Sequence, residues 1–459
     1  MEQLTVFLGK VNDFAWGWPL LTLLLGTGLL LTIRLGLIQI IKLPKALKLI
    51  FTAKNYGDGD INSFGALCTA LAATVGTGNI VGVATAIAAG GPGALFWMWT
   101  AAFVGMATKY AEGVLAIKYR KVDENGQMSG GPMYYILNGM GEKWRPLAIF
   151  FAFSGVLVAL LGIGTFSQVN SITSSINNLT GIPPQVISII VASLVGIIII
   201  GGIKSISKVS SKVVPFMAMI YILACGIILA INFKAIPTAF ATILSSAFTG
   251  HAALGGFAGA IMKDAISKGV ARGVFSNESG LGSAPIAAAA AKTQWPAEQG
   301  LISMTGTFID SIIICTLTGL TLVITGVWSM SGDAALMTQS AFSTVFGNFG
   351  AAALSICLVL FAFTTILGWN YYGERCIEFL FGVKGITPYR ILFICMVALG
   401  GFLKVSLVWT IADIVNALMA FPNLIALLAL SGVVVSETKK YFEHLKSEEL
   451  TSNKDKSLS

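Results

Sequence analysis

Long apolar runs recur along this chain, and the charged residues gather in the short segments between them. Each run holds the roughly 20 mostly apolar residues that an α-helix needs to cross a bilayer. The pattern predicts about eleven membrane-spanning helices, which cover residues 15–40, 64–90, 93–117, 147–176, 184–203, 213–232, 262–291, 300–328, 350–373, 387–403 and 407–435. We therefore expect an all-α integral membrane protein, in which the backbone polar groups are satisfied within helices.

Composition supports this class and excludes several others. Only 11% of the 459 residues are charged and the mean hydropathy is +0.82, whereas soluble domains are about a quarter charged. The net charge of +8 comes from short basic clusters without a nucleic-acid-binding motif, so no nucleic acid partner is expected. The six cysteines are scattered without a CxxC pair, so the sequence predicts no metal centre and no cofactor.

Basic residues are unevenly distributed between the alternate connections of the predicted helices. The segments 42–62, 118–146, 203–212, 292, 375–390 and 437–459 all fall on one side, and they hold 21 of the 29 Lys and Arg residues. Because cytoplasmic loops are enriched in Lys and Arg, we expect a multi-pass protein of the plasma (cytoplasmic) membrane. Its N-terminus is predicted outside and its C-terminus in the cytoplasm, which requires an odd number of spans. Residues 437–459 are polar and are expected to form a frayed cytoplasmic tail.

Two glycine-rich stretches interrupt apolar spans, at residues 72–82 and 272–285. Glycine permits backbone conformations that unwind a helix, and Pro285 removes a hydrogen-bond donor. Unwound backbone at membrane depth is tolerated where it is buried in protein or lines a water-filled cavity. Its free carbonyls suit a cation and the adjoining helix ends suit an anion, such as an amino acid carboxylate beside a sodium ion. The alternative is that these glycines only allow close helix packing, the role expected for Gly82.

The positions of the two breaks indicate an internal repeat. With the first span set aside, ten remain, and each break falls in the first helix of a group of five. Corresponding breaks in two halves of opposite topology are typical of transporters built from inverted repeats. The expected organisation is an extra N-terminal helix and cytoplasmic loop (1–62), a first repeat (63–233), a second repeat (234–436) and the tail (437–459).

Two motifs carry a resemblance to a known family. GGPGALFWMW at 90–99, followed by Gly105, and NESGLGSAP at 277–285, followed by a run of alanines, resemble the signatures of the alanine or glycine:cation symporter family. The resemblance covers essentially the whole chain. It implies a LeuT-type fold with five plus five inverted repeats, here with one extra N-terminal helix. It also implies sodium-coupled, and sometimes proton-coupled, uptake of alanine or glycine.

The same resemblance implies a set of binding residues. The segment 76–79, Gly-Thr-Gly-Asn, is similar to the break in the first core helix of that fold, which implies that the substrate carboxylate is held by Gly76, Thr77, Gly78 and Asn79. It likewise implies a sodium site formed by the carbonyls of Ala72 and Val75 and the hydroxyls of Thr364 and Thr365. Adjacent threonines in a helix can instead bond back to their own helix carbonyls. The number of ions is left open.

Further pocket residues are chosen by their chemistry. Gln168 and Ser276 can each donate or accept a hydrogen bond to the substrate. The aromatic side chains of Phe166, Phe275 and Trp369 would limit the volume of a small site, although most aromatic residues in membrane proteins pack or mark the interfaces.

Ionisable residues within the spans are functional candidates. Glu278 adjoins the second break and is expected either to lock the unwound backbone or to carry a proton, and Asp310 is a second candidate ion or proton site. Lys109 and Glu112, three residues apart, are expected to pair on one helix. Arg272 and Asp413 are expected near the outer side as a candidate gate, or else as two charges facing water.

Transport is thus the predicted function. A channel would show a pore loop or a ring of charges, and an enzyme would show a catalytic motif such as HExxH or GxSxG; the sequence has none of these. The leading hypothesis is a symporter whose partners are a small neutral amino acid, the sodium ion and the lipid bilayer. The alternative is proton coupling through Glu278 or Asp310.

Overall fold

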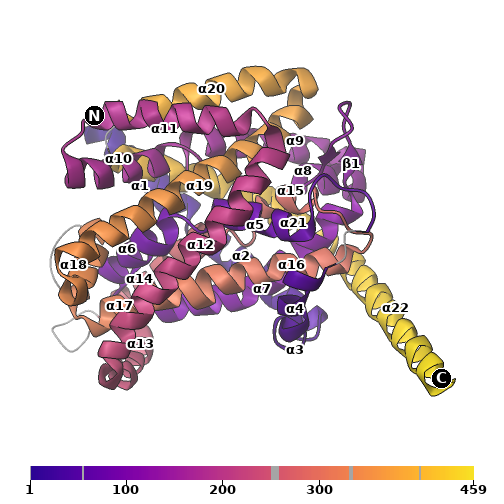
Figure 1. The fold of residues 1–459 in the computed structure, drawn as a ribbon, viewed down its shortest axis with the longest axis horizontal. Helices are drawn as coiled ribbons and strands as arrows, with labels where there is room; N and C mark the ends of the chain where they lie inside the picture. The colour runs from indigo at the N-terminus through magenta and orange to yellow at the C-terminus, as the bar shows by residue number, and fades with distance from the viewer. Residues whose placement is uncertain (1, 54–55, 250–257, 330–333, 403–404, 459) are drawn as a thin grey trace.

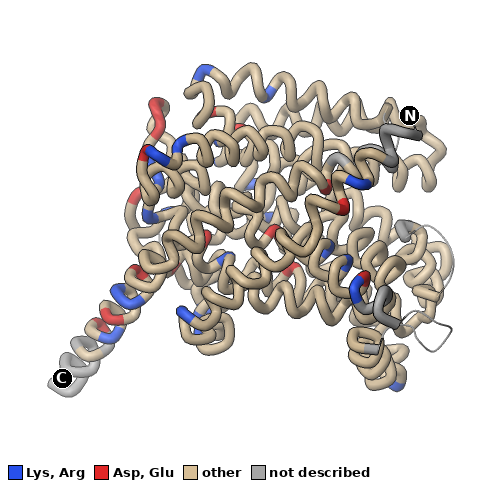
Figure 2. Tube along the Cα trace, turned by 180° about the vertical axis from the view of Figure 1, so that it is seen from behind, with Lys and Arg blue, Asp and Glu red and all other residues tan. Residues whose placement is uncertain are grey.

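The computed structural model describes residues 2–53, 56–249, 258–329, 334–402 and 405–458, and it is a bundle of α-helices (Figure 1). Within these residues the only sheet is a short antiparallel hairpin, β1 (Lys121–Val122) with β2 (Met128–Ser129). This confirms the all-α class. Along the Cα trace, Lys and Arg positions occur at both ends of the bundle, and many of them lie around the end from which the C-terminal helix projects (Figure 2). The orientation of that end in the membrane stays a prediction.

The helices follow the predicted spans in order along the chain. They are α2 (Trp18–Arg34), α5 (Ser63–Thr74) with α6 (Val83–Gly90), α7 (Gly93–Lys118), α9 (Arg145–Leu161) with α10 (Phe166–Thr180), α11 (Pro184–Ile199), α12 (Gly202–Ile231), α14 (Ala258–Asn277) with α15 (Ala284–Ala288), α16 (Pro296–Thr307) with α17 (Thr316–Ile324), α19 (Asn348–Phe381), α20 (Ile386–Leu399) and α21 (Val405–Ala429). Several begin with proline in their first turn, where its missing N–H has no intrahelical acceptor.

Within the described residues, seven helical segments are long and apolar enough to cross a bilayer, and the bent pair α5–α6 is an eighth. The remaining predicted spans are shorter, broken or charged: α11 has 16 residues, and α7 carries Lys109 and Glu112 in its buried part. The structure is therefore consistent with eleven spans. Shorter helices connect or cover them: α1 (Glu2–Ala15), α3 (Ile38–Ile41), α4 (Leu43–Thr52), α8 (Pro132–Tyr135), α13 (Ile236–Thr249) and α18 (Ala334–Phe346).

Helix α7 is the centre of the packing around the two breaks. It contacts α14, α15 and α16, while α5 packs against α12 and α19, and α10 packs against α19. Helix α7 therefore packs along α14, α15 and α6, while α19 packs on α5 and α15.

Three local features differ from the sequence predictions. Helix α2 ends at Arg34 rather than near residue 40, because Gly36 and Leu37 adopt left-handed backbone conformations with φ of 63° and 57°. The span expected at 147–176 is interrupted between α9 and α10, at Gly162 to Thr165. The third difference is the tail.

A frayed tail was expected from the sequence. Over its described length the tail instead forms the helix α22 (Ser431–Leu458). Its first turns are fixed to the bundle, since Lys118 pairs with Glu437 at 3.0 Å and the hydroxyls of Tyr110 and Thr438 are 2.8 Å apart. The contacts continue to His444, whose ring stacks on Trp295 with centroids 4.6 Å apart, and beyond it the helix projects away from the bundle (Figure 1). Polarity alone predicted the exposure of this segment but not its anchoring.

Candidate functional site

The first break separates α5 from α6 with a bend of 52°. The chain leaves α5 after Thr74 and re-enters through a π-helical turn, η1 (Gly78–Gly82). Asn79 fixes this turn: its Oδ1 accepts the backbone N–H of Gly76 at 2.8 Å, and its Nδ2 donates to Asp310 Oδ1 at 2.7 Å. The Asn79 amide is thus occupied by the protein itself, which makes it a residue that positions the break.

The second break runs from the end of α14 to the start of α15. Its backbone takes left-handed conformations at Glu278 (φ 56°), Gly280 and Gly282. Lys109 Nζ donates to the carbonyl of Glu278 at 3.2 Å, and Glu112 Oε1 accepts the N–H of Gly280 at 3.1 Å. The expected ion pair between Lys109 and Glu112 is therefore wrong. Lys109 and Glu112 instead form hydrogen bonds with backbone groups of the second break.

The two breaks lie against each other. A Cβ atom placed on Gly78 would lie 3.0 Å from Ser276 Cα and 3.5 Å from a ring carbon of Phe275. Asp310, in the π-helical segment η6 (Phe308–Cys315), joins them. Its carboxylate accepts from Asn79 on the first break and from Ser276 Oγ, at 2.9 Å, on the second. Gly78, Asn79, Phe275 and Ser276 are therefore brought together, as the site predicted from sequence requires.

Gln168 and Thr365 meet the first break from the side of α10 and α19. Thr365 Oγ1 is the atom nearest to the position of a Cβ on Gly76, and Gln168 Oε1 lies 3.6 Å from that position. The Gln168 side chain is fully buried, yet neither of its amide atoms has a hydrogen-bond partner within the described residues, and the same holds for the hydroxyl of Thr77. A buried polar group without a partner costs about 1–3 kcal/mol, so this placement suits a ligand.

The two candidate sodium ligands on α19 differ in their surroundings. Thr365 Oγ1 donates to the carbonyl of Phe361 at 3.0 Å, beside Gly76. Thr364 Oγ1 donates to the same carbonyl at 3.0 Å and lies 3.6 Å from Met217 Sδ on α12. Both hydroxyls thus bond back to their own helix while keeping oxygen lone pairs. Ala72 and Val75 are fully buried in the apolar cluster that contains Phe361.

The aromatic candidates have separate positions. Trp369 is fully buried, and its Nε1 donates to Glu278 Oε1 at 2.9 Å, so it anchors the second break. Its Cβ lies 2.8 Å from the position of a Cβ on Gly164, in the interruption between α9 and α10. Phe166 is buried at the start of α10, two residues before Gln168. Sequence reasoning missed this interruption, although the spacing of Gly162 and Gly164 was a signal for it.

Glu278 and Asp310 have different partners. The Glu278 carboxylate accepts from Trp369 Nε1 and from the hydroxyl of Ser283 within its own break. Asp310 accepts from three neutral donors, and its third is Ser311 Oγ at 2.8 Å. The hydrogen bonds of Glu278 hold the backbone of the second break in place, whereas Asp310 lies between the two breaks.

Arg272 and Asp413 form a bidentate ion pair between α14 and α21. The two hydrogen bonds are 2.9 and 2.7 Å long, and the side chains are 18% and 8% exposed. Trp16, which follows α1, donates its indole N–H to the carbonyl of Asp413 at 2.9 Å. The structure thus joins the residues of the candidate gate and adds an N-terminal contact that the sequence did not predict.

At the end of the bundle where α22 begins, Arg120 holds the two broken helices together. Its guanidinium donates to the carbonyls of Asp58, Ala289, Ala291 and Thr293 at 2.6 to 3.0 Å. Backbone hydrogen bonds reinforce this junction, because Ile61 accepts from the N–H of residue 292 at 2.8 Å and donates to the carbonyl of residue 290 at 3.1 Å. The start of α5 is thereby tied to the end of α15.

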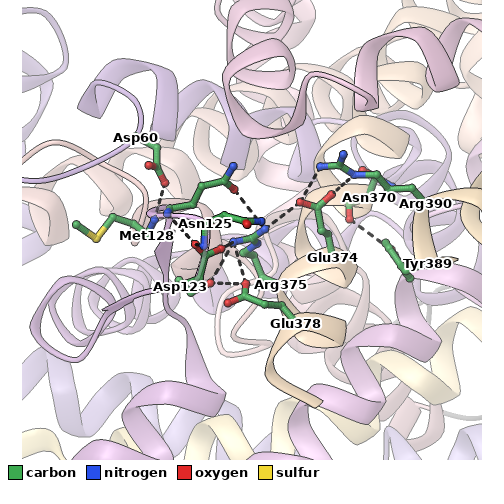
Figure 3. A network of polar contacts seen from close by, with 12 residues as sticks. Asp60, Asp123, Asn125, Met128, Asn370, Glu374, Arg375, Glu378, Tyr389 and Arg390 are labelled. Atoms are coloured by element: carbon green, nitrogen blue, oxygen red, sulfur yellow. Dashed lines mark hydrogen bonds and ion pairs between the residues drawn. The ribbon is translucent and has the colours of Figure 1, made fainter. Parts of the chain in front are cut away.

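A second polar network lies at the same end (Figure 3). Arg375 on α19 is buried and pairs with Asp123 of the hairpin at 3.1 Å, and with Glu374 and Glu378 at 3.0 and 2.8 Å. Arg390 on α20 pairs with Glu374 at 2.7 Å. The network fastens the hairpin to α19 and α20. The span predicted to end at residue 373 stops just before this network, and the contact with Asp123, which is distant in the chain, could not be predicted from local sequence.

Comparison with known proteins identifies the family to which the chain belongs. Residues 1–455 match the model of the sodium:alanine symporter family. An uncharacterised transporter of Haemophilus influenzae is 58% identical over 96% of each chain. The sodium/alanine symporter AgcS of Methanococcus maripaludis is 53% identical, over 96% of this chain and 98% of AgcS. The crystal structure of MhsT in complex with L-phenylalanine aligns with a TM-score of 0.50 at 13% identity, covering 83% of this chain and 99% of MhsT, which shows the LeuT-type fold. This chain belongs to the sodium:alanine symporter family.

Proposed function

We propose that the chain is a secondary active symporter that couples inward movement of sodium to uptake of a small neutral amino acid, alanine or glycine, by alternating access. The observation that carries this proposal is the convergence of the two helix breaks with Gln168 and Thr365. Gly76 lies beside Thr365 and the unpartnered amide of Gln168, and Gly78, two residues on in the same break, lies against Ser276 and Phe275 of the second break. Family membership supports the transport class.

The substrate site is assigned to the residues around that position. The carboxylate lies against the backbone of Gly76, Thr77 and Gly78, where partial positive charge at the start of a half-helix favours an anion. Gln168 donates or accepts at the polar end of the substrate. Phe275 and Ser276 pack directly against Gly78, and this restricts the room for a side chain to a small one.

The sodium site is assigned to the carbonyls of Ala72 and Val75 and the hydroxyls of Thr364 and Thr365. Oxygen atoms are the ligands of hard cations. The end of α5 supplies carbonyls that the unwound turn leaves without helical donors. Because Thr365 lies beside Gly76, which directly follows the end of α5 and Val75 in the chain, the ion and the substrate would order the same turn of backbone, and this provides their coupling.

Two closures on opposite sides of the site provide alternating access. The ion pair between Arg272 and Asp413 is assigned to the outer closure, and the carbonyl clamp of Arg120 to the cytoplasmic one. This assignment uses the orientation predicted from the basic residues, with the N-terminus outside and α22 in the cytoplasm, in the plasma membrane.

A proton-coupled amino acid symporter is the second candidate, and one observation favours Asp310 over Glu278 for that role. The Asp310 carboxylate accepts hydrogen bonds from both breaks. Protonation would remove one accepting position and would therefore alter the junction of the two broken helices. The Glu278 carboxylate accepts hydrogen bonds from Ser283, which lies in the second break, and from Trp369, which lies beside it.

Reconstitution separates the two candidates. Proteoliposomes that contain the purified protein are given an inward sodium gradient at equal pH, or an inward proton gradient without sodium, and uptake of radiolabelled alanine is followed. Sodium coupling predicts accumulation only with the sodium gradient. Accumulation with the proton gradient alone would establish the second candidate, and failure of both gradients would contradict alanine symport.

A further inference from the structure

Helix α12 is longer than a bilayer requires. Its 30 residues span about 45 Å at 1.5 Å per residue, whereas the hydrocarbon core is about 30 Å thick and takes roughly 20 residues. The last 20 residues, 212–231, are apolar apart from Lys212 and the hydroxyl of Tyr221. The first two or three turns therefore extend beyond the hydrocarbon, on the side predicted to be cytoplasmic.

Three lysines occupy one face of this extension. Lys204, Lys208 and Lys212 are spaced four residues apart, so they lie one above the other on the helix surface, and all three are exposed. None of them forms an ion pair with an acidic side chain of the described residues. The stripe is thus a column of positive charge with which no acidic side chain of the described residues forms an ion pair.

The same face continues as an exposed apolar surface. Phe216 follows Lys212 by one turn and is 59% exposed, and beyond it lie Met219, Leu223, Ile227 and Ile231, which are 47–62% exposed. In a bilayer this part of the face contacts acyl chains. The lysine column therefore ends at the depth where the headgroups meet the hydrocarbon.

We propose that the face formed by Lys204, Lys208, Lys212 and Phe216 binds an anionic phospholipid of the cytoplasmic leaflet. The phosphate and a charged or hydroxylated headgroup lie along the lysines, and an acyl chain packs on Phe216 and the apolar residues above it. A lipid fits better than a free phosphate, because only a lipid carries charge and hydrocarbon in the order in which this face presents lysine and apolar side chains.

The position of this site connects it to the transport machinery. The same part of α12 packs on the start of α5, where a Cβ on Gly65 would meet the hydroxyls of Ser207 and Ser211. Asp60, just before α5, accepts the N–H of Met128 at 2.8 Å. The bound lipid therefore lies beside the cytoplasmic end of the first broken helix, so it is placed to influence the movement of that helix.

The test measures lipid binding and does not depend on the transported substrate. The purified full chain is titrated with phosphatidylglycerol or phosphatidylcholine in detergent, and bound lipid is counted by native mass spectrometry. The test variant carries Lys204→Gln, Lys208→Gln and Lys212→Gln. A control variant with the same loss of charge carries Lys121→Gln, Lys439→Gln and Lys446→Gln, at exposed positions away from α12.

We expect the test variant to lose affinity for phosphatidylglycerol by on the order of a hundred-fold, from about 1 kcal/mol per lysine, with little change in the control. Phosphatidylcholine binding should be weak in all three proteins, and inorganic phosphate should not displace phosphatidylglycerol. Equal binding by the wild type and the test variant would overturn the proposal. Equal losses in both variants, or displacement by phosphate alone, would overturn it as well.

Discussion

Asn79 and Asp310 are joined by a 2.7 Å hydrogen bond from Nδ2 to Oδ1. This bond connects the first helix break to the π-helical segment η6, which lies between α16 and α17. The other end of the Asn79 amide accepts the N–H of Gly76 at 2.8 Å. One side chain thus sets the geometry of the unwound turn from two directions. Because Asp310 also accepts from Ser276, the position of each break depends on that of the other.

The first prediction concerns the contact between the breaks. In Gly78→Ala the new methyl group would lie 3.0 Å from Ser276 Cα, which is backbone and cannot swing aside. Overpacking of this kind costs about 1–3 kcal/mol, so we expect alanine affinity measured by calorimetry to fall roughly five- to hundred-fold, with the protein still monodisperse.

Gly82→Ala is the matched control for this variant. No atom lies within 4 Å of a Cβ on Gly82, other than the backbone of its own helix, so the packing role expected from sequence is wrong and the substitution should leave affinity and melting temperature near the wild-type values. Normal alanine affinity in Gly78→Ala would show that the substrate is held elsewhere.

A second prediction separates an oxygen ligand from a purely packing role at Thr365. Thr365→Val keeps the shape but removes the hydroxyl beside Gly76, so the sodium concentration for half-maximal uptake should rise about tenfold. Thr365→Ser retains the oxygen and should keep most of the sodium affinity. If valine and serine behave alike, the hydroxyl does not bind the ion.

The ion pair of Arg272 and Asp413 yields a third prediction. Arg272→Asp or Asp413→Arg alone leaves two like charges facing each other, and both variants should lose uptake and melting temperature. The exchanged pair, with both substitutions, should recover part of each loss, because residues in contact are energetically coupled. Additive losses in the double variant would mean that the two charges act independently in the vestibule.

The fourth prediction concerns the closure proposed for Arg120. Arg120→Ala removes the donor for four carbonyls. The start of α5 and the end of α15 should therefore separate more often. Ser303→Cys is a suitable reporter, because Ser303 lines the cavity shared with Ala66 and Ala288. The exposed Cys395 is replaced by serine, so that it does not react with the label. Labelling of this thiol should accelerate in Arg120→Ala but not in the control Arg145→Ala, whose side chain is 62% exposed at the surface. Equal labelling rates would remove Arg120 from the closure.

Much of this architecture is predictable from local sequence. Apolar length gives the spans, and the glycines at 72–82 and 272–285 mark both breaks, because unwound helix at membrane depth requires such residues. Contacts made across the fold are not predictable in this way. The partners of Lys109 and Glu112 on the second break and the carbonyl clamp of Arg120 depend on which helices become neighbours. Spacing on a single helix contains no information about those neighbours.

The central claim is that a sodium ion and an amino acid cross the membrane together, and the membrane potential tests this directly. Alanine is a neutral zwitterion at pH 7, so a one-to-one symport moves one positive charge inward. A potential of 100 mV then supplies about 2.3 kcal/mol, which is roughly a forty-fold increase in accumulation. Radiolabelled alanine uptake into proteoliposomes is measured with a fixed sodium gradient, while potassium and valinomycin set the potential. The account predicts that an inside-negative potential raises accumulation by about this factor; accumulation that does not change with the potential would contradict it.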